Sequence, residues 1–533
     1  MWKKGWREVV WSALDQTWDM VVVGGGITGA GVFHEAAALG FKVLLVEAND
    51  FSFGTSSRSS KLAHGGFRYL YNRQYHVTYE SVREREALIK EAPGLVEPLP
   101  FNLPNYSAYK FAGSIISAGL AIYDLMAPKW DHQRLSIADI MLEYPDLHGD
   151  GLSGAYRYKD AVLDDSRLVL RVIKEGVLLG GTALNYARVE HLLCDGAGHV
   201  RGVAISDTSG FRSQQIEVKA RVVVNATGPW TDDLRSFLGV PQRIRKLRGS
   251  HLILTKERLP VREAITLFHP RDRRAMFVIP WEGTTLIGTT DIDYDLELNE
   301  KHNEPFASRE EVAYMMEALD FLFPSLEISE ADIISSFSGL RPIIDTGAST
   351  PSKESRAHQI WNEDGLITIT GGKLTTFRLM ARQTVKTALA SIGHEAKLRD
   401  NSPLLAPLDR AVLQGVDPAT GEYLRGRYGL ETSLLLAAAN DDEHGHIDAL
   451  PNIWAELRWA ARAEGIVHLD DLLLRRVRIG MLLLDGAQGL MARIRAIVQT
   501  ETGWDDQRWE QEEARYREIW KAYYSPIAGE SQS

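Results

Sequence analysis

The sequence predicts an α/β protein with three parts: a Rossmann-like domain on a parallel sheet, a domain on an antiparallel sheet, and a C-terminal helical domain. Three observations support this prediction. Two apolar segments near the start flank a glycine cluster and an apolar helix, a βαβ pattern that requires a parallel sheet. Apolar segments separated by turns between residues 245 and 295 predict antiparallel strands. Residues 408–523 are rich in Leu, Ala, Arg and Glu at helical spacing.

The elements of the parallel sheet follow in order from the apolar pattern. Asp19–Val23 and Phe41–Glu47 are predicted to be buried strands, and Ile27–Leu39 between them is predicted to be a helix. Arg221–Asn225 and Leu366–Thr370 are predicted to be further strands. Short strands between residues 185 and 224 are expected to lead into the first of these two.

Three helices outside this unit are also predicted. Residues 75–97 form a charged helix. Phe111–Ala127 is the longest apolar stretch but is too short to span a bilayer comfortably, so we expect a buried core helix, with a membrane-facing helix as the alternative. The first 18 residues carry Trp2 and Trp6 beside basic residues. They form either an interfacial membrane helix or a helix packed on the domain behind it, and we favour the second.

Changes in sequence pattern along the chain predict the domain boundaries. After Pro403 the chain becomes rich in helix-forming residues at helical spacing, which indicates a separate C-terminal domain. The longer unit before it contains two domains that interleave along the chain. The substrate-binding part of that unit is expected mainly in residues 75–160 and 240–345. The four predicted segments are a lead at 1–18, the interleaved cofactor and substrate domains at 19–400, the α-helical domain at 401–525 and a tail at 526–533.

Length and composition limit the possible function classes. The chain has 533 residues, of which 44% are hydrophobic and 25% charged, as in ordinary soluble globular proteins. A net charge of −11 disfavours general nucleic-acid binding, so no nucleic-acid partner is expected. Cys194 is the single cysteine, which excludes an internal disulfide and a Cys-based metal site, and we predict no metal. We expect neither a secretory signal nor a membrane-spanning segment.

A glycine cluster between the first strand and the first helix predicts a dinucleotide site. Gly24, Gly26 and Gly29 stand at G-x-G-x-x-G spacing. The first glycine permits a tight turn, the second lets the backbone approach a pyrophosphate, and the third lets the helix pack closely on the strand. Ile27 and Thr28 open the helix, whose free N–H groups and dipole favour an anion.

Glu47 and a second strand end indicate which dinucleotide is bound. Glu47 lies at the end of the next strand, 23 residues after Gly24, where a carboxylate accepts hydrogen bonds from ribose hydroxyls. Residues 222–230, VVVNATGPW, end a strand in a turn that includes Thr227 and Gly228. In flavoproteins of the glutathione-reductase-like class, this "ATG" turn accompanies FAD. We therefore predict an FAD-binding Rossmann-like (glutathione-reductase-like) domain.

A hydroxyl-rich cluster follows, FGTSSRSSKLAHGGFRYL at residues 53–70. Its hydroxyls and backbone amides suit a pyrophosphate and a ribityl chain, and its Gly-Gly pair lets the backbone lie flat against a flavin ring. We expect His64 to contact the flavin through its backbone. The candidate cofactor contacts are Thr55, Ser56, Ser57, Lys61, Leu62, His64, Gly65 and Gly66.

Two later motifs offer cations. The first is SGLRPIID, residues 338–345, in which Arg341 precedes a proline and its backbone is therefore extended. A guanidinium fixed in this way suits a carboxylate or a phosphate as ligand. The alternative is a salt bridge with a purely structural role. LITITGGKLTTFRLMA, residues 366–381, predicts a strand, a turn and a helix whose N-terminus faces the flavin. We expect cofactor contacts from Gly372, Leu374 and Thr375. Lys373 would add charge there or hold the substrate.

RGSHLIL, residues 248–254, contains the histidine that we would test first as a base. His251 stands on a predicted strand, and a lone histidine in such a position is more often structural than catalytic. GTTDIDYD, residues 288–295, lies on a neighbouring strand and contains Thr290.

Together these motifs resemble the FAD-dependent, quinone-linked glycerol-3-phosphate dehydrogenase family. DMVVVGGGITGAG, TSSRSSKLAHGGFRYL, VVVNATGPW, RGSHLIL, FVIPW, IGTTD, FSGLRPI, SRAH and GGKLTTFR follow the family's order over residues 19–381. Residues 408–500 are similar to the family's C-terminal helical cap, with Asp470-Asp471 and Arg475-Arg476 in the expected style. The lead before Asp19 is longer than usual in the family, and the C-terminal domain matches least closely.

The resemblance implies oxidation of sn-glycerol 3-phosphate to dihydroxyacetone phosphate, with hydride transfer from C2 to flavin N5 and electrons passed to a membrane quinone. It implies catalytic roles for His251, Arg341 and Lys373. Arg341 either binds the phosphate or stabilises the developing alkoxide. The expected substrate contacts are Arg68, Tyr69, Thr290, Arg341 and Lys373.

Alternatives remain open at this stage. They are an oxygen-using glycerol-3-phosphate oxidase, an FAD-dependent amine or amino-acid oxidoreductase of the same fold, and a non-catalytic flavin-binding or membrane-associated protein. The quinone role implies a cytoplasmic protein with peripheral contact to the cytoplasmic membrane. A homodimer is a further open possibility.

Overall fold

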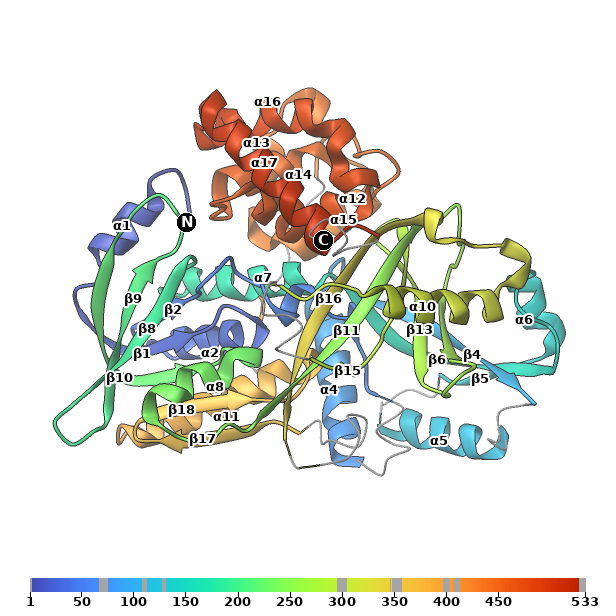
Figure 1. The fold of residues 1–533 in the computed structure, drawn as a ribbon, viewed down its shortest axis with the longest axis horizontal. Coiled ribbons are helices and arrows are strands. Elements are labelled where there is room, and N and C mark those ends of the chain that lie inside the picture. The colour runs from blue at the N-terminus through green and yellow to red at the C-terminus, as the bar shows by residue number, and fades with distance from the viewer. Residues whose placement is uncertain are drawn as a thin grey trace.

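A computed structural model describes residues 2–66, 75–107, 113–126, 131–294, 304–345, 347, 357–395, 403–406 and 413–526. Its three parts are a domain around a mainly parallel sheet, a domain around a second, mainly antiparallel sheet, and a helical domain above both (Figure 1). This arrangement confirms the predicted fold class.

The first sheet has its parallel strands in its centre. β1 (Thr17–Val23) pairs in parallel with β2 (Val43–Val46) and with β10 (Gln215–Asn225). The order along the sheet is β17-β18-β10-β1-β2-β7. The remaining strands of this sheet are β7 (Thr182–Leu184), β8 (Ala187–Cys194), β9 (Val200–Asp207), β17 (Gln359–Glu363) and β18 (Leu366–Thr370).

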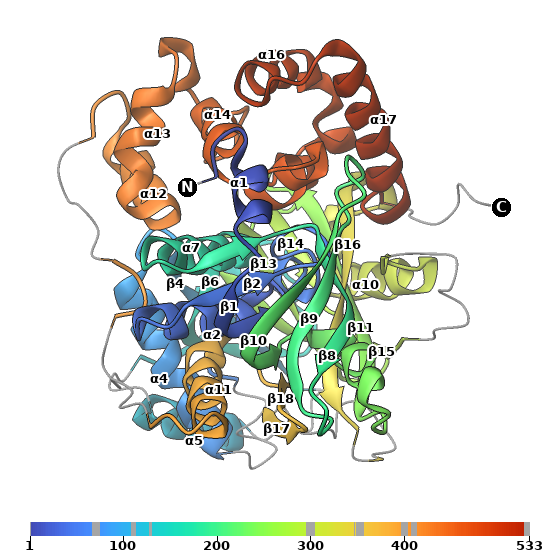
Figure 2. The same cartoon turned by 90° about the vertical axis from the view of Figure 1, so that its left-hand side faces the viewer.

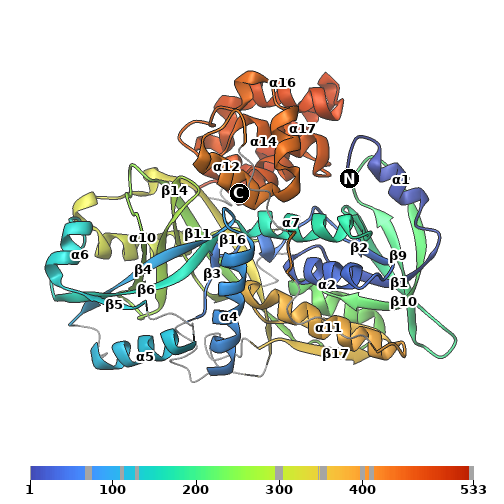
Figure 3. The same cartoon turned by 180° about the vertical axis from the view of Figure 1, so that it is seen from behind.

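Alternation along β1 divides its apolar side chains between two cores. Met20 and Val22 contribute to the core under α2 (Ile27–Ala38), α7 (Asp165–Leu178) and α11 (Phe377–Ser391). These three helices cover one face of the sheet (Figure 3). Val21 and Val23 belong to the core on the other face, which β8, β9 and the N-terminal segment cover (Figure 2).

The second sheet runs in the order β15-β11-β14-β13-β12-β4-β6-β3, with β16 paired to β11 and β5 to β6. β11 therefore lies between β14 and β16, which places residues from three distant segments side by side. The strands are β3 (Leu62–Ala63), β4 (Val96–Tyr106), β5 (Gln133–Leu135), β6 (Leu152–Leu163), β11 (Ile244–Thr255), β12 (Ala264–Phe268), β13 (Ala275–Trp281), β14 (Thr284–Gly288), β15 (Ile292–Asp293) and β16 (Ile333–Ile344).

Helices cover both faces of this sheet. α10 (Arg309–Leu322) packs on one face in a core that is separate from that of the C-terminal domain. Side chains on the other face share a continuous core with α4, α5 and the helical domain. The other α-helices that the structure describes before residue 396 are α1 (Trp6–Ser12), α4 (Tyr75–Glu91), α5 (Gly113–Met126), α6 (Ile137–Glu143) and α8 (Thr231–Arg235).

The helical domain is tied to the parallel-sheet domain by buried ion pairs. Asp50 accepts hydrogen bonds from Arg475 Nε at 2.6 Å and from both terminal nitrogens of Arg476 at 2.6 and 2.8 Å. Arg167 on α7 pairs with Glu464 at 2.7 Å. The α-helices of this domain are α12 (Pro418–Tyr428), α13 (Thr432–Ala438), α14 (Trp454–Ala463), α15 (Ile479–Leu482), α16 (Met491–Thr502) and α17 (Asp506–Tyr523).

The N-terminal lead packs on the domain behind it, which is the favoured of its two expected arrangements. Within the lead, α1 is short and tryptophans point inward: Trp2 stacks on Phe51 at a ring separation of 5.2 Å, and Trp11 is buried. The expectation of a buried core helix over Phe111–Ala127 holds for one side of α5 only: Leu120 and Tyr123 lie in the core, but Ile122 and Leu125 are 41% and 75% exposed. Phe111, Ala112 and Ala127 lie outside the described residues. Among the described helices, none is both long and apolar enough to cross a membrane.

Candidate active site

One pocket of about 1170 Å³ joins most of the predicted site residues. It begins at the carboxyl ends of the parallel strands, where open α/β sheets bind their ligands, and it continues to the second sheet at Gly339 and Arg341 on β16. Predicted residues that line it are Gly24, Gly26, Ile27, Thr28, Glu47, Thr55, Ser56, Leu62, His64, Thr227, Gly228, Arg341, Gly372, Lys373, Leu374 and Thr375.

The glycine loop is shaped by close backbone contacts. A Cβ built on Gly24, whose φ is +110°, would lie 2.5 Å from the carbonyl oxygen of Ala226. A Cβ on Gly29 would lie 1.8 Å from the carbonyl oxygen of Gly24. Gly29 does not line the pocket; its lack of a side chain lets α2 approach β1. The N-terminus of α2 thereby faces the pocket at Gly26, Ile27 and Thr28, and the side chain that accepts from its first N–H is Ser56.

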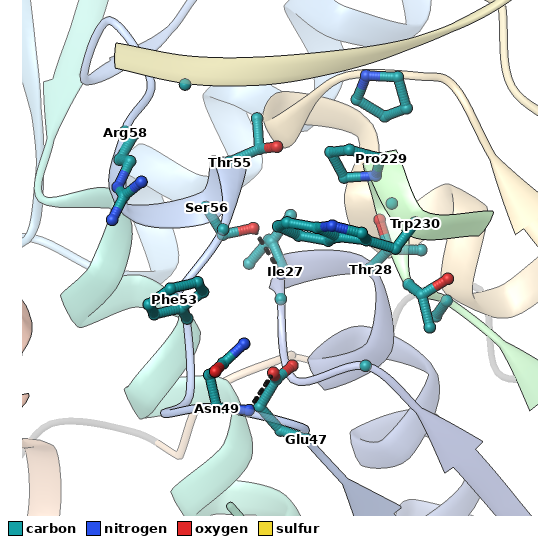
Figure 4. A pocket seen from close by; sticks show the side chains of 18 of the residues that line it. Ile27, Thr28, Glu47, Asn49, Phe53, Thr55, Ser56, Arg58, Pro229 and Trp230 are labelled. Carbon is teal, nitrogen blue, oxygen red and sulfur yellow. Dashed lines mark hydrogen bonds between the residues drawn. The ribbon is translucent and has the colours of Figure 1, made fainter. Parts of the chain in front are cut away.

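Glu47 lies beside the glycine loop and accepts a hydrogen bond from its backbone. Its carboxylate accepts a hydrogen bond from the N–H of Gly25 at 2.7 Å. It accepts a second from the N–H of Asn49 at 2.8 Å (Figure 4). Burial raises the pKa of the carboxyl, and the two N–H donors oppose that rise. A buried carboxylate at the end of β2 is the group expected to accept ribose hydroxyl hydrogen bonds.

The hydroxyl-rich segment crosses the start of α2. The hydroxyl of Ser56 accepts a hydrogen bond from the N–H of Ile27 at 2.9 Å (Figure 4), and the hydroxyl of Thr55 donates to the carbonyl of Leu340 on β16. On the opposite side, the "ATG" turn brings Trp230 close to Gly54, where an added Cβ would lie 2.8 Å from the indole. These contacts narrow the pocket beside the glycine loop.

At the other end of the pocket, β18 runs into a double-glycine turn. Gly371 and Gly372 have φ values of +74° and +73°, a conformation that other residues rarely adopt. A Cβ on Gly372 would lie 2.4 Å from Met380 Sδ. The turn presents Lys373, Leu374 and Thr375 to the pocket. Without side chains at these two positions, a ring can approach the backbone of this turn closely.

Arg341 reaches the pocket with its guanidinium held on two sides. Its Nη1 lies 2.8 Å from Asp291 Oδ1, and its Nη2 donates to Thr289 Oγ1 at 2.8 Å. These bonds fix the plane of the guanidinium. Thr290 is not brought to this pocket: its hydroxyl donates to Glu311 at 2.6 Å, and the residue lines a smaller cavity instead.

Lys61 does not line the pocket, because its side chain binds other residues of the protein. Its buried ammonium lies 2.9 Å from both carboxylate oxygens of Asp165 and donates to the carbonyl of Ser57 at 2.6 Å. Burial, followed by the nearby Arg478, lowers the pKa of Lys61 to about 7. The side chain of Lys61, which the sequence predicts to contact the cofactor, is therefore held in an ion pair with Asp165.

Three more predicted cofactor residues lie outside the lining. Ser57 is buried, with its hydroxyl 3.4 Å from the carbonyl of Phe53. Gly65 donates its N–H to Asp160 at 3.0 Å, and its close neighbour is Tyr123 of α5, so it packs away from the pocket. Gly66 has a φ of +81°. Arg68 and Tyr69, the predicted substrate contacts, lie outside the described residues.

His251 lies behind the pocket wall. It is 1% exposed and stacks on Phe337 with a ring separation of 4.7 Å. Its Nε2 lies 2.9 Å from the hydroxyl of Ser60, and Ser60 does line the pocket. Burial, then Arg341 and Lys61, lower the pKa of His251 well below 6.5. The imidazole is therefore neutral at neutral pH.

Several lining residues escaped the sequence reasoning. Arg58, buried and paired with Glu304, lines the pocket together with that glutamate. The last helix, α17, contributes Arg515, Glu518 and Ile519. The backbone of β16 meets the end of that helix, where Ser336 N–H donates to the carbonyl of Tyr524 at 2.8 Å. Only tertiary packing brings α17 here, and no local motif marks it.

The residues present fit FAD. The N-terminus of α2 faces the expected pyrophosphate position, with the hydroxyl of Ser56 on its first N–H, and Glu47 lies where ribose is expected. Gly371 and Gly372 let a ring approach the backbone of their turn in the same continuous pocket. The lack of side chains at Gly24 and Gly29 maintains this cradle, because a Cβ at either position would collide with backbone.

Comparison with known proteins agrees with this geometry. Residues 19–386 match the FAD dependent oxidoreductase family, and residues 367–509 match the C-terminal domain of alpha-glycerophosphate oxidase. An aerobic glycerol-3-phosphate dehydrogenase of Staphylococcus epidermidis is 34% identical over 490 residues, 87% of each chain. The chain belongs to the FAD-dependent glycerol-3-phosphate dehydrogenase family. The resemblance drawn from the motifs and the prediction of FAD as cofactor are thereby confirmed.

Two solved structures extend the comparison. The glycerol-3-phosphate dehydrogenase from Bacillus halodurans, complexed with FAD, superposes with a TM-score of 0.78 at 27% identity, covering 98% of both chains. The L-alpha-glycerophosphate oxidase from Mycoplasma pneumoniae, with FAD bound, gives 0.58 at 15% identity over 74% of this chain and 99% of its own. The second likeness concerns the fold alone.

Proposed function

We propose that this chain oxidises sn-glycerol 3-phosphate to dihydroxyacetone phosphate and passes the electrons to a membrane quinone. The observation that carries the proposal is the juxtaposition, in one pocket, of an FAD cradle with Arg341, Lys373 and Ser60. The cationic side chains of Arg341 and Lys373 suit a dianionic phosphate. The hydroxyl of Ser60, hydrogen-bonded to the neutral His251, suits proton removal from an alcohol. The names of the relatives support the same substrate.

Bound FAD supplies the acceptor for the hydride that leaves C2 of the substrate. The chain has the remaining tasks. Arg341, fixed by Asp291 and Thr289, orients the substrate either at its phosphate or at the oxygen on C2. Lys373 adds a second positive charge beside the double-glycine turn. The surrounding walls, including α17, limit the access of water.

Anaerobic reduction of the flavin tests the substrate. We expect sn-glycerol 3-phosphate to bleach the flavin absorbance rapidly, and the sn-1 enantiomer, glycerol and glycine to leave it unchanged. Bleaching by glycine but not by glycerol 3-phosphate would favour the amino-acid oxidoreductase alternative. An enzyme that no substrate bleaches, although FAD is bound, would contradict the proposal.

Reoxidation of the reduced enzyme tests the acceptor. After reduction without oxygen, we expect a soluble ubiquinone analogue to restore the flavin absorbance much faster than air-saturated buffer. The relatives' names, which are those of dehydrogenases rather than oxidases, support an acceptor other than oxygen. Faster reoxidation by oxygen would identify an oxidase. Flotation with vesicles of anionic lipid measures the proposed peripheral membrane contact.

A further inference from the structure

Ser60 connects the pocket to a histidine that does not reach it. Its hydroxyl lines the cavity and lies 2.9 Å from His251 Nε2. Among the described residues this is the one hydrogen bond that the imidazole makes, because its Nδ1 is buried without a partner. A ligand in the pocket therefore meets Ser60, and His251 can act on it only through that hydroxyl.

The fold holds the imidazole in this position from two sides. β16 stacks Phe337 on one face of the ring, at an interplanar angle of 12°. β14 packs against the ring at Gly288, where an added Cβ would lie 2.4 Å from His251 Cδ2. This packing opposes rotation of the ring toward the pocket.

We propose that Ser60 is the residue that contacts the C2 hydroxyl of the substrate and passes its proton to His251 Nε2. This inference rests on the proposed function. The substrate O–H bond breaks as a new O–H bond forms at Ser60, whose own proton moves to Nε2. The C2–H electron pair leaves at the same time as hydride to FAD, the oxidant. Nε2 accepts a proton only when the proton of the neutral ring sits on Nδ1.

The surroundings of the ring keep it unprotonated before the reaction and make it a weaker base. Burial lowers the pKa of His251 most, followed by Arg341 on β16 and Lys61 before β3, whose positive charges disfavour a positive charge on the imidazole. The ring is consequently neutral before the reaction. The same two cations destabilise the imidazolium that forms, so we expect the proton to leave the ring before the next turnover.

A double-mutant cycle tests the relay. Ser60→Ala, His251→Asn and the double variant are mixed with sn-glycerol 3-phosphate without oxygen, and the rate constant of flavin reduction is measured. A positioned base contributes about 10²–10⁴-fold. We expect each single variant to lose roughly 100-fold or more, and the double variant to be no slower than the slower single variant. Effects that multiply would overturn the relay.

Two further measurements separate the relay from a structural role. FAD content and melting temperature of Ser60→Ala should equal those of the control Ser153→Ala, which removes an exposed hydroxyl bonded to Asn105. In mixtures of H₂O and D₂O, the wild-type reduction rate should depend on the deuterium fraction along a curve, because two protons move. A straight line would indicate one proton and direct transfer to His251, which overturns the proposal.

The outcome for the wild-type protein distinguishes the two levels of inference. If glycerol 3-phosphate does not reduce wild-type flavin, the proposed function fails. If it does, and Ser60→Ala reduces flavin at the wild-type rate with an unchanged pH profile while His251→Asn is slow, only the relay fails.

Discussion

Replacing Asp50 with Asn should loosen the docking of the helical domain. Asp50 is fully buried on the parallel-sheet domain and receives three hydrogen bonds from Arg475 and Arg476 of the helical domain. The substitution keeps the size of the side chain and removes its charge. Both guanidinium groups are 2% exposed, so water cannot replace the lost partner.

The expected cost follows from the burial. Removing one partner of a buried ion pair typically costs about 3–5 kcal/mol, because the remaining charge stays desolvated. Arg475 retains Asp470 and Asp471, which places the estimate toward the lower limit, about 3 kcal/mol. Because α17 of the helical domain lines the cofactor pocket, the same change should weaken FAD binding.

Urea unfolding of the FAD-bound enzyme, followed by flavin and tryptophan fluorescence, measures this loss. The matched control is Asp442→Asn, which breaks the exposed pair with Arg493 and should change the free energy of unfolding by less than about 1 kcal/mol. Equal stability of the two variants would refute the reasoning.

The pH dependence provides a second check on Asp50. Burial tends to raise its pKa, but Arg476 and Arg475 outweigh burial and hold the pKa below its usual value. A depressed carboxyl pKa stabilises the folded state above the unfolded-state pKa, and this contribution is lost as pH falls through the folded-state pKa. The stability difference between wild type and Asp50→Asn should therefore persist at neutral pH and shrink in acid below about pH 4.

Gly29→Ala would place a Cβ 1.8 Å from a backbone oxygen, so we expect FAD to be lost on purification, measured as the flavin-to-protein absorbance ratio. Gly149→Ala, with open space around it, should keep FAD, and retention by both variants would contradict the role of the loop. Arg341→Lys keeps the positive charge but loses the two parallel N–H donors of the guanidinium, which should raise the KM for glycerol 3-phosphate roughly 10- to 100-fold. An unchanged KM would show that Arg341 does not bind the ground-state substrate. Because burial, with Arg341 and Lys61, holds the pKa of His251 well below 6.5, the rate constant of flavin reduction at saturating substrate should stay level from neutral pH to 6.5 and fall only in more acidic solution. A fall that begins above pH 6.5 would exclude His251 as the titrating base.

Local motifs identified the cofactor half of the pocket. Gly24, Ile27 and Glu47 line it because each lies at a strand end or at the first turn of a helix, positions that the hydrophobic pattern reveals. The motif approach failed where a side chain had a distant alternative partner. Lys61 lies in the expected cluster, yet Asp165, 104 residues away, holds its ammonium.

The amino-acid pattern was sufficient for the βαβ unit, the glycine loop, the helical texture after residue 408 and, through the combined motifs, the family. These features depend on backbone conformation and hydrophobic periodicity over a few neighbouring residues. Tertiary structure alone decided that α17 borders the pocket and that Ser60 stands between it and His251, 191 residues further along the chain. Such contacts depend on which strands pair and how domains dock, and those choices are made by burial and charge pairing over the whole molecule.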